Sequence, residues 1–345
     1  QSLKLLAPII PDNSKIYGLY EDILKQAVHD ESIFVTKGFT LSIPQFNFEI
    51  LSLYSERILE TLLTNAKVKT TNNNDYQTRK AAIESIAFFG IKMLNNNINN
   101  NYIDRILETI LDGLNDYEID KKLGDVGAEV RKAVIKGLSD YIIELYKHNY
   151  HEIVLKYSEK YVNGLLKQLA EKMNKIRLCA GESLQKFFTI IDNLDIPFYN
   201  ELKTIFSEDI KYDELNNLVN ISWLEPSYGY NKIIHILLYE NYSFSLFEGL
   251  IISIGGITED VQRCSLTALN DLLKEIIQQI IIEGKIENDN GAGCSGVIEN
   301  YAREIGVSDV AKKLNVTMIH PGYGFLSERS HFAKAVEEAG INFLG

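Results

Sequence analysis

The chain has 345 residues, of which 46% are hydrophobic and 24% charged, and its formal net charge is −12. This length permits two or three ordinary domains or one extended repeat array, and the acidic balance argues against a nucleic-acid surface and against binding to anionic lipid. Cys179, Cys264 and Cys294 lie far apart without CxxC spacing, which rules out a zinc or disulfide framework and fits a reducing compartment. The most apolar runs, 246–257 and 276–282, are too short to span a bilayer, and no signal peptide opens the chain, so we expect a cytoplasmic location without membrane insertion.

Six prolines occur in the whole chain, and apolar residues recur every three or four positions, which predicts a mostly helical protein. Short polar breaks separate the apolar stretches, as is typical of antiparallel helix pairs. In chain order, helices are predicted at 16–28, 33–42, 50–63, 75–93, 102–114, 126–147, 153–173, 176–191, 231–238, 244–254 and 259–277.

A weak internal repeat runs through these helices. Each copy has an Asp or Asn, then a branched residue followed by a basic or polar one, then a small residue. The branched residues recur about every 40–50 residues, with one double interval, which is typical of a HEAT or armadillo α-solenoid. The copies are centred on Val35-Thr36, Thr78-Arg79, Val130-Arg131, Ile176-Arg177 and Val261-Gln262.

The repeat has a structural explanation. We expect the Asp or Asn to cap the second helix of each pair by accepting hydrogen bonds from free backbone N–H groups. The branched and small residues are expected on the inner face, where they let helices pack closely, and each Arg is expected to reach back to an acid of a neighbouring repeat. Such charges form a ladder that holds the stack together and imply no catalysis. Trp223, the single tryptophan, is expected to anchor a loop against the solenoid.

Four stretches resemble one known family, in the family's own order. Residues 116–132 read DYEIDKKLGDVGAEVRK and resemble the segment DYTxDxRGDVGxWVR of tubulin-folding cofactor D, a HEAT-repeat tubulin chaperone. Residues 158–177 resemble the family's next repeat. Residues 220–227 (NISWLEPS) resemble its VNWSxPS loop, and residues 247–259 (FEGLIISIGGITE) resemble its LLGLVxSxGGLTE helix and turn.

This resemblance covers 1–283, more weakly before 116, and Glu129 departs from it because the family often carries a bulky residue there. The family's N-terminal half has no counterpart here, and the chain begins with Gln1, so we expect the natural start to be missing. The resemblance implies a binding protein with no catalytic residues and no cofactor. It implies β-tubulin, tubulin cofactors C and E and an Arf-like small GTPase as partners, assembly and disassembly of the αβ-tubulin heterodimer, and regulation of the GTPase through partners.

The sequence changes in character near Gly306. A fragment of a parallel α/β sheet is predicted, in the order helix 307–314, strand 316–319, glycine loop 320–326, helix 330–339 and strand 341–344. The loop HPGYGFLSE at 320–328 resembles the N-terminal subdomain of biotin carboxylases, as found in pyruvate and acyl-CoA carboxylases. Because that family's loop lies against the biotin ureido ring, the resemblance implies Tyr323 and Gly324 as the ligand-binding positions.

The carboxylase resemblance ends at Gly345, before the family's ATP-grasp domain, so we expect an inactive enzyme fragment at most. Residues 291–296 satisfy GxGxxG but do not follow a buried strand, which favours a linker at 284–304. The sequence thus predicts an all-α HEAT/armadillo solenoid at 1–283, the linker, and a truncated α/β fragment at 305–345. A tubulin-folding cofactor is the expected function. A biotin-dependent carboxylase fragment and a generic HEAT adaptor are the alternatives.

Overall fold

A computed structural model describes the chain in several stretches, which fall into two compact units, Gln1–Gln262 and Arg263–Gly345. The described residues are 22, 33–43, 54–67, 75–96, 102–207, 222–255, 258–282, 317–319, 333–334, 336–337 and 340–343.

The first unit is built from helix pairs. The first helices of three successive pairs begin at Ser55, Ile103 and His151, a constant interval of 48 residues. The pairs are α5 (Ser55–Ala66) with α6 (Tyr76–Asn95), α7 (Ile103–Asp112) with α8 (Gly127–Lys147), and α9 (His151–Leu169) with α10 (Asn174–Ile190).

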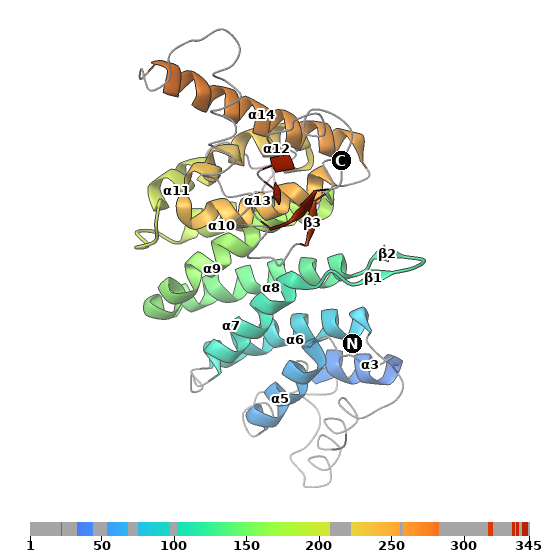
Figure 1. Ribbon diagram of the computed structural model, residues 1–345. Helices are drawn as coiled ribbons and strands as arrows, with labels where there is room; N and C mark the ends of the chain where they lie inside the picture. The colour runs from blue at the N-terminus through green and yellow to red at the C-terminus, as the bar shows by residue number, and fades with distance from the viewer. Residues whose placement is uncertain are drawn as a thin grey trace. The chain divides into compact units, whose positions relative to one another are not determined.

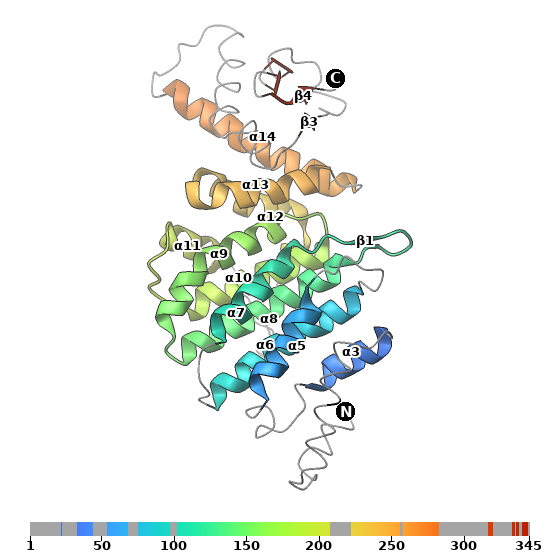
Figure 2. The ribbon, with the colours of Figure 1, turned by 60° about the horizontal axis from the view of Figure 1, so that its bottom comes forward.

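These pairs stack into two layers. Helices α6, α8 and α10 pack side by side in one layer, with α3 (Ile33–Ser42) beside α6. Helices α5, α7 and α9 form the other layer, and α13 (Glu240–Ile254) packs on α9. Figures 1 and 2 show the same stacking from two directions. Each repeat buries its apolar faces only against its neighbours, so the predicted all-α solenoid is confirmed.

The apolar spacing explains why the helices form and which face they bury. In α7, Ile103, Ile106, Leu107 and Ile110 are all buried, at the i, i+3, i+4, i+7 positions of one helical face. Helix α6 starts at a proper cap, because the Asp75 carboxylate accepts from the backbone N–H groups of residues 77 and 78. Most of the predicted helices that fall in the described residues begin and end within a few residues of their predicted bounds.

Several elements differ from the prediction. Helix α9 ends at Leu169 rather than at 173, because residues 170–173 turn to present carbonyls to Arg177. The predicted helix 231–238 begins earlier, as α12 (Pro226–Ile233), with Pro226 in the first turn where no N–H is needed, and continues as η4 (Ile234–Leu238). Four features were not predicted from the sequence. They are the helix α11 (Tyr199–Ser207), the short η2 (Gly113–Asn115) and η3 (Ser222–Leu224), and the hairpin of β1 (Ile119–Asp120) and β2 (Gly124–Asp125).

Helix α14 (Glu259–Ile282) crosses the boundary between the units. In the second unit, β3 (Met318–Ile319) and β4 (Asn342–Phe343) pair in parallel, with Met318 opposite Asn342. Both strands fall where the sequence predicts them, and residues 333–334 and 336–337 are helical as predicted. The predicted helix 307–314 and the glycine loop lie outside the described residues, as does the predicted helix 16–28 apart from the helical residue 22. No described helix is long and apolar enough to cross a membrane.

Candidate functional site

Three arginines occupy the same place in three successive repeats, near the start of α6, α8 and α10. Arg79, Arg131 and Arg177 are at most 2% exposed. The residues that precede them are buried as well, and so are Ala82, Val134 and Ala180 three positions further on, so the predicted inner-face positions are confirmed. A guanidinium removed from water must have nearly all its donors satisfied, which makes the partners of these side chains informative.

Arg79 reaches into the loop of the following repeat. Its Nε and Nη2 donate to the Asp116 carboxylate at 2.7 and 3.2 Å, and Nη2 also bonds Glu118. This fork-to-fork geometry is the strong form of the arginine–carboxylate pair.

Arg131 repeats this arrangement one step further along the stack. Its Nη2 donates to Glu171 in the next loop at 2.9 Å and to Asp125 in its own loop at 2.9 Å. Nη1 donates to the main-chain oxygen of Asp116 at 2.7 Å, and Nε donates to Gln168 at 3.1 Å. The guanidinium also stacks 4.0 Å from the centre of the Tyr117 ring.

Arg177 completes the series through main-chain oxygens. Its Nη1 donates to the carbonyls of Glu171 and Lys172 at 3.0 Å each, and Nη2 reaches the carbonyl of Leu224 at 3.4 Å. Asp116 and Glu171 thus each accept from two arginines, one at the carboxylate and the other at the carbonyl. We call this continuous set of bonds the arginine ladder: Arg79, Asp116, Arg131, Glu171 and Arg177.

Burial tunes the ionisable groups of the arginine ladder. Desolvation raises the pKa of Glu171, although the Arg131 guanidinium opposes that shift. Its second carboxylate oxygen, Oε2, is buried without a hydrogen-bond partner among the described residues, which agrees with the direction. Burial also raises the pKa of Tyr117 to about 12, so its hydroxyl stays protonated. The side chains are held for structure, and no nucleophile or general base is poised among them.

The structure confirms the predicted link to an acid of a neighbouring repeat for Arg79 and Arg131. The predicted direction is wrong, because each acid comes from the repeat that follows rather than from the one before. The capping prediction holds for Asp75, and Asp125 accepts from the N–H of Ala128 at 3.1 Å. It is wrong for Asn174, which lies inside α10 and accepts instead from the Arg177 guanidinium at 2.6 Å. The competing charged donor takes the amide oxygen that a cap would have used.

Trp223 anchors its loop, as predicted. The indole is 1% exposed, and its Nε1–H donates to Gln185 in α10 at 3.0 Å. Its ring lies directly over Gly181, where a Cβ atom would come within 2.6 Å of ring carbons. The loop is thereby fixed to α10.

The β1–β2 hairpin projects from the N-terminal end of α8 in both ribbon views. Its base is tied into the arginine ladder by Asp116, Glu118 and Asp125. Its tip carries Ile119 and Leu123, which are 77% and 70% exposed, the highest values among the large hydrophobic residues that the structure describes.

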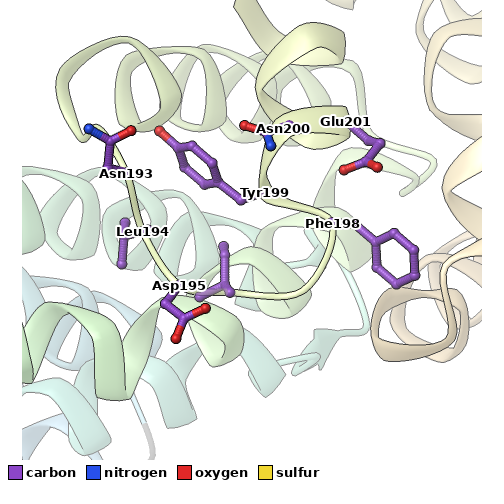
Figure 3. A pocket seen from close by; sticks show the side chains of 8 residues that line it. Asn193, Leu194, Asp195, Phe198, Tyr199, Asn200 and Glu201 are labelled. Atoms are coloured by element: carbon purple, nitrogen blue, oxygen red, sulfur yellow. The ribbon is translucent and has the colours of Figure 1, made fainter.

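A pocket of about 470 Å³ lies in the loop between α10 and α11. Figure 3 shows that Asp195 and Glu201 lie on different sides of it and do not converge on a common point. The Tyr199 hydroxyl already donates within the protein, to the carbonyl of Ile191 at 2.8 Å. The lining therefore offers no convergent set of polar groups for a small ligand.

Within the described stretches, no group of three or more His, Cys, Asp or Glu side chains is placed to hold a metal ion. His148, which lies near His151 in the sequence, donates from Nε2 to the Asn95 amide oxygen at 2.9 Å. The proposed biotin-loop positions Tyr323 and Gly324 lie outside the described residues. Their role stays a prediction.

Taken together, the stacked helix pairs and the buried arginine ladder that links them define an α-solenoid. Comparison with known families then separates two segments. Residues 159–289 match the family model for the C-terminal region of tubulin folding cofactor D, and residues 290–345 match the model for the biotin carboxylase N-terminal domain. Both predicted resemblances are confirmed. The segment 116–132 precedes the first matched range.

Curated relatives match a stretch of 48–50 residues of this chain. Pyruvate carboxylase of Bacillus subtilis (strain 168) is 54% identical over 48 residues, which is 14% of this chain and 4% of that protein. Biotin carboxylase of Halalkalibacterium halodurans is 51% identical over 49 residues, 14% of this chain and 11% of that protein. Human mitochondrial pyruvate carboxylase is 48% identical over 48 residues, with the same 14% and 4%. The chain thus spans a small fraction of the length of these relatives.

Proposed function

We propose that this chain is a tubulin-folding cofactor: a binding protein that holds β-tubulin and takes part in assembling and disassembling the αβ-tubulin heterodimer. The observation that carries the proposal is the match of 159–289 to the cofactor D family, most of which falls in the unit built as stacked helix pairs. Solenoids of this kind bind proteins over extended surfaces that many repeats supply together. The buried charges of the arginine ladder stiffen such a surface and leave no catalytic group.

The proposal includes partners and location. Tubulin cofactors C and E and an Arf-like small GTPase are the proposed co-workers, and GTPase regulation would act through them rather than through a residue of this chain. HEAT-type repeats are supported by the 48-residue interval between helix pairs. The proposed location is the cytoplasm, where the client is found.

A second candidate rests on the tail. The match of 290–345 to the biotin carboxylase N-terminal domain favours a fragment of a biotin-dependent carboxylase of the pyruvate carboxylase type. We propose that this fragment is inactive as it stands and takes Tyr323 and Gly324 as its biotin-facing positions. A third candidate, a HEAT-repeat adaptor with no connection to tubulin, shares the helical scaffold alone.

One experiment separates the three. The full chain is passed with purified αβ-tubulin through size-exclusion chromatography, and its affinity is measured by biolayer interferometry. A complex of about micromolar affinity or tighter is expected, with an unrelated acidic α-solenoid as the control that does not bind. Absence of a complex would leave the adaptor, and biotin-dependent release of ADP from Mg-ATP and bicarbonate by the same sample would favour the carboxylase.

A further inference from the structure

The β1–β2 hairpin is held too firmly to be a passive loop. At its base, Glu118 bonds Arg79, the Asp125 carboxylate pairs with Arg131 at 2.9 Å, and the N–H of Gly127 donates to the carbonyl of Glu118 at 3.1 Å. Gly127 permits this close approach, because a Cβ there would come within 2.3 Å of the carbonyl oxygen of Asp116. The base is thus continuous with the buried core of the unit.

The tip is fixed as well. The Asp120 carboxylate accepts from the backbone N–H groups of Lys122 and Leu123 at 2.7 and 2.8 Å, which closes the turn. Gly124 then takes a left-handed conformation, with φ of +76°, that favours glycine. A turn built in this way holds the backbone of the tip in one conformation.

What this rigid tip presents is apolar and basic. Ile119 and Leu123 are about three-quarters exposed, and Lys121 and Lys122 between them are exposed too. Neither lysine forms an ion pair with another residue in the stretches that the structure describes. The acids at the base of the hairpin, Glu118 and Asp125, are bound by arginines. Asp120 is exposed at the tip, where its carboxylate accepts from the turn, so two lysines against one aspartate leave the tip with a net positive charge on a chain of net charge −12.

We infer that the hairpin tip, Ile119 to Leu123, is a docking element for a protein surface that offers an apolar depression rimmed by carboxylates. Two aliphatic side chains fill the depression, where desolvated anchors carry most of the binding energy. The two lysines pair with the rim and speed association by electrostatic attraction. Resting on the proposed function, the partner that carries this surface is the client, β-tubulin.

The test compares paired variants of the full chain in binding to immobilised αβ-tubulin, at about 50 and 200 mM salt. Ile119→Ser with Leu123→Ser should raise the dissociation rate about tenfold or more, because the anchors are lost. Lys121→Glu with Lys122→Glu should slow association about tenfold at the lower salt and flatten its salt dependence.

Matched controls lie outside the hairpin. Lys132→Glu with Lys136→Glu changes the same amount of charge at exposed positions of α8, and Leu155→Ser with Leu238→Ser removes two other exposed leucines. Both controls should bind within about twofold of the wild type. The hairpin and lysine variants should share the wild-type thermal unfolding midpoint, because their mutated side chains are exposed. Leu155→Ser with Leu238→Ser, at residues 39% and 48% exposed, is compared at equal folded fraction.

The outcomes separate the two proposals. Wild-type binding with hairpin variants that behave like the controls overturns this inference and leaves the proposed function standing. Failure of the wild type to bind overturns both. Light scattering that shows a concentration-dependent dimer, lost in the hairpin variants, would assign the tip to a second copy of this chain and would also overturn the inference.

Discussion

At the scale of single residues, each buried arginine stabilises a specific neighbour. Arg131 has the most partners, with two carboxylates, a carbonyl, an amide oxygen and the face of Tyr117 around one guanidinium. Buried ion pairs are weak contributors to net stability, yet removal of one partner is costly because the other charge is left in a dry environment. In the exposed ion pairs of the same unit, water solvates the charge that remains when its partner is removed, so that removal costs little stability.

This difference gives a first prediction. Arg131→Met should lower the free energy of unfolding by about 3–5 kcal/mol, because it strands Glu171 and Asp125. Arg105→Met is the matched control: Arg105 also contacts two acids, Glu56 and Glu60, but its side chain is 38% exposed, and it should cost about 1 kcal/mol or less. Urea unfolding followed by far-UV circular dichroism measures both. If the two variants lost equal unfolding free energy, the larger cost expected for the buried arginine would be contradicted.

A second prediction concerns the pH dependence due to Glu171. Because desolvation raises its pKa in the folded protein, the folded state binds its proton more tightly than the unfolded chain does. The stability due to Glu171 is then fully present below about pH 4.3 and falls as pH rises through the folded-state pKa. The unfolding free energy of the wild type minus that of Glu171→Gln should therefore decrease from pH 4 toward neutrality. The reason is that the unfolded chain loses the Glu171 proton at a lower pH than the folded protein does.

Asp120 supplies a control of opposite sign for that measurement. Its backbone hydrogen bonds to Leu123 and Lys122 lower its pKa, so its contribution is present at higher pH and lost as pH falls. The wild-type minus Asp120→Asn difference should increase with pH mainly below about pH 4 and stay nearly constant above it. If the two stability differences changed with pH in the same direction, the opposite pKa shifts given to Glu171 and Asp120 would be wrong.

At the scale of elements, close packing decides where helices and loops meet. Gly181→Ala should destabilise the first unit by about 1–3 kcal/mol, because the new Cβ overlaps the buried Trp223 ring. Gly38→Ala is the control: nothing lies within 4 Å of a Cβ there, and alanine favours the helix, so stability should rise or stay unchanged. Trp223 is the single tryptophan, so its fluorescence emission reports the displaced loop directly. An unshifted spectrum with unchanged stability would contradict this packing.

Elements also show how far sequence alone reaches. Helix existence follows from apolar spacing, and the Val-Arg anchors identify the buried face, so α6, α8 and α10 were predictable. The hairpin was not, because its two-residue strands are too short for an alternating pattern and its conformation depends on Arg79 and Arg131. The shortened α9 likewise depends on carbonyls needed by Arg177. Polar contacts between residues far apart in the chain produce no periodic pattern in the local sequence, so they cannot be predicted from it.

At the scale of the whole molecule, two family resemblances share one chain. The family models meet at residues 289 and 290, whereas the compact units divide at residues 262 and 263, inside α14. The larger unit carries the scaffold and the candidate docking tip, so the proposed tubulin binding belongs to it. The parallel pairing of β3 with β4 agrees with the α/β character of the second family.

The arginine ladder has a consequence for how the protein is made. Each arginine is translated before its distant partner: Arg79 precedes Asp116 by 37 residues, and Arg131 precedes Glu171 by 40. A repeat leaving the ribosome therefore lacks the acid that its arginine binds in the next loop until that loop emerges, although Arg131 already has Asp125 of its own loop. We expect each repeat to lock only when its successor has been synthesised, so a nascent chain arrested before Glu171 should be cut by protease within α8, and one arrested well beyond it should resist.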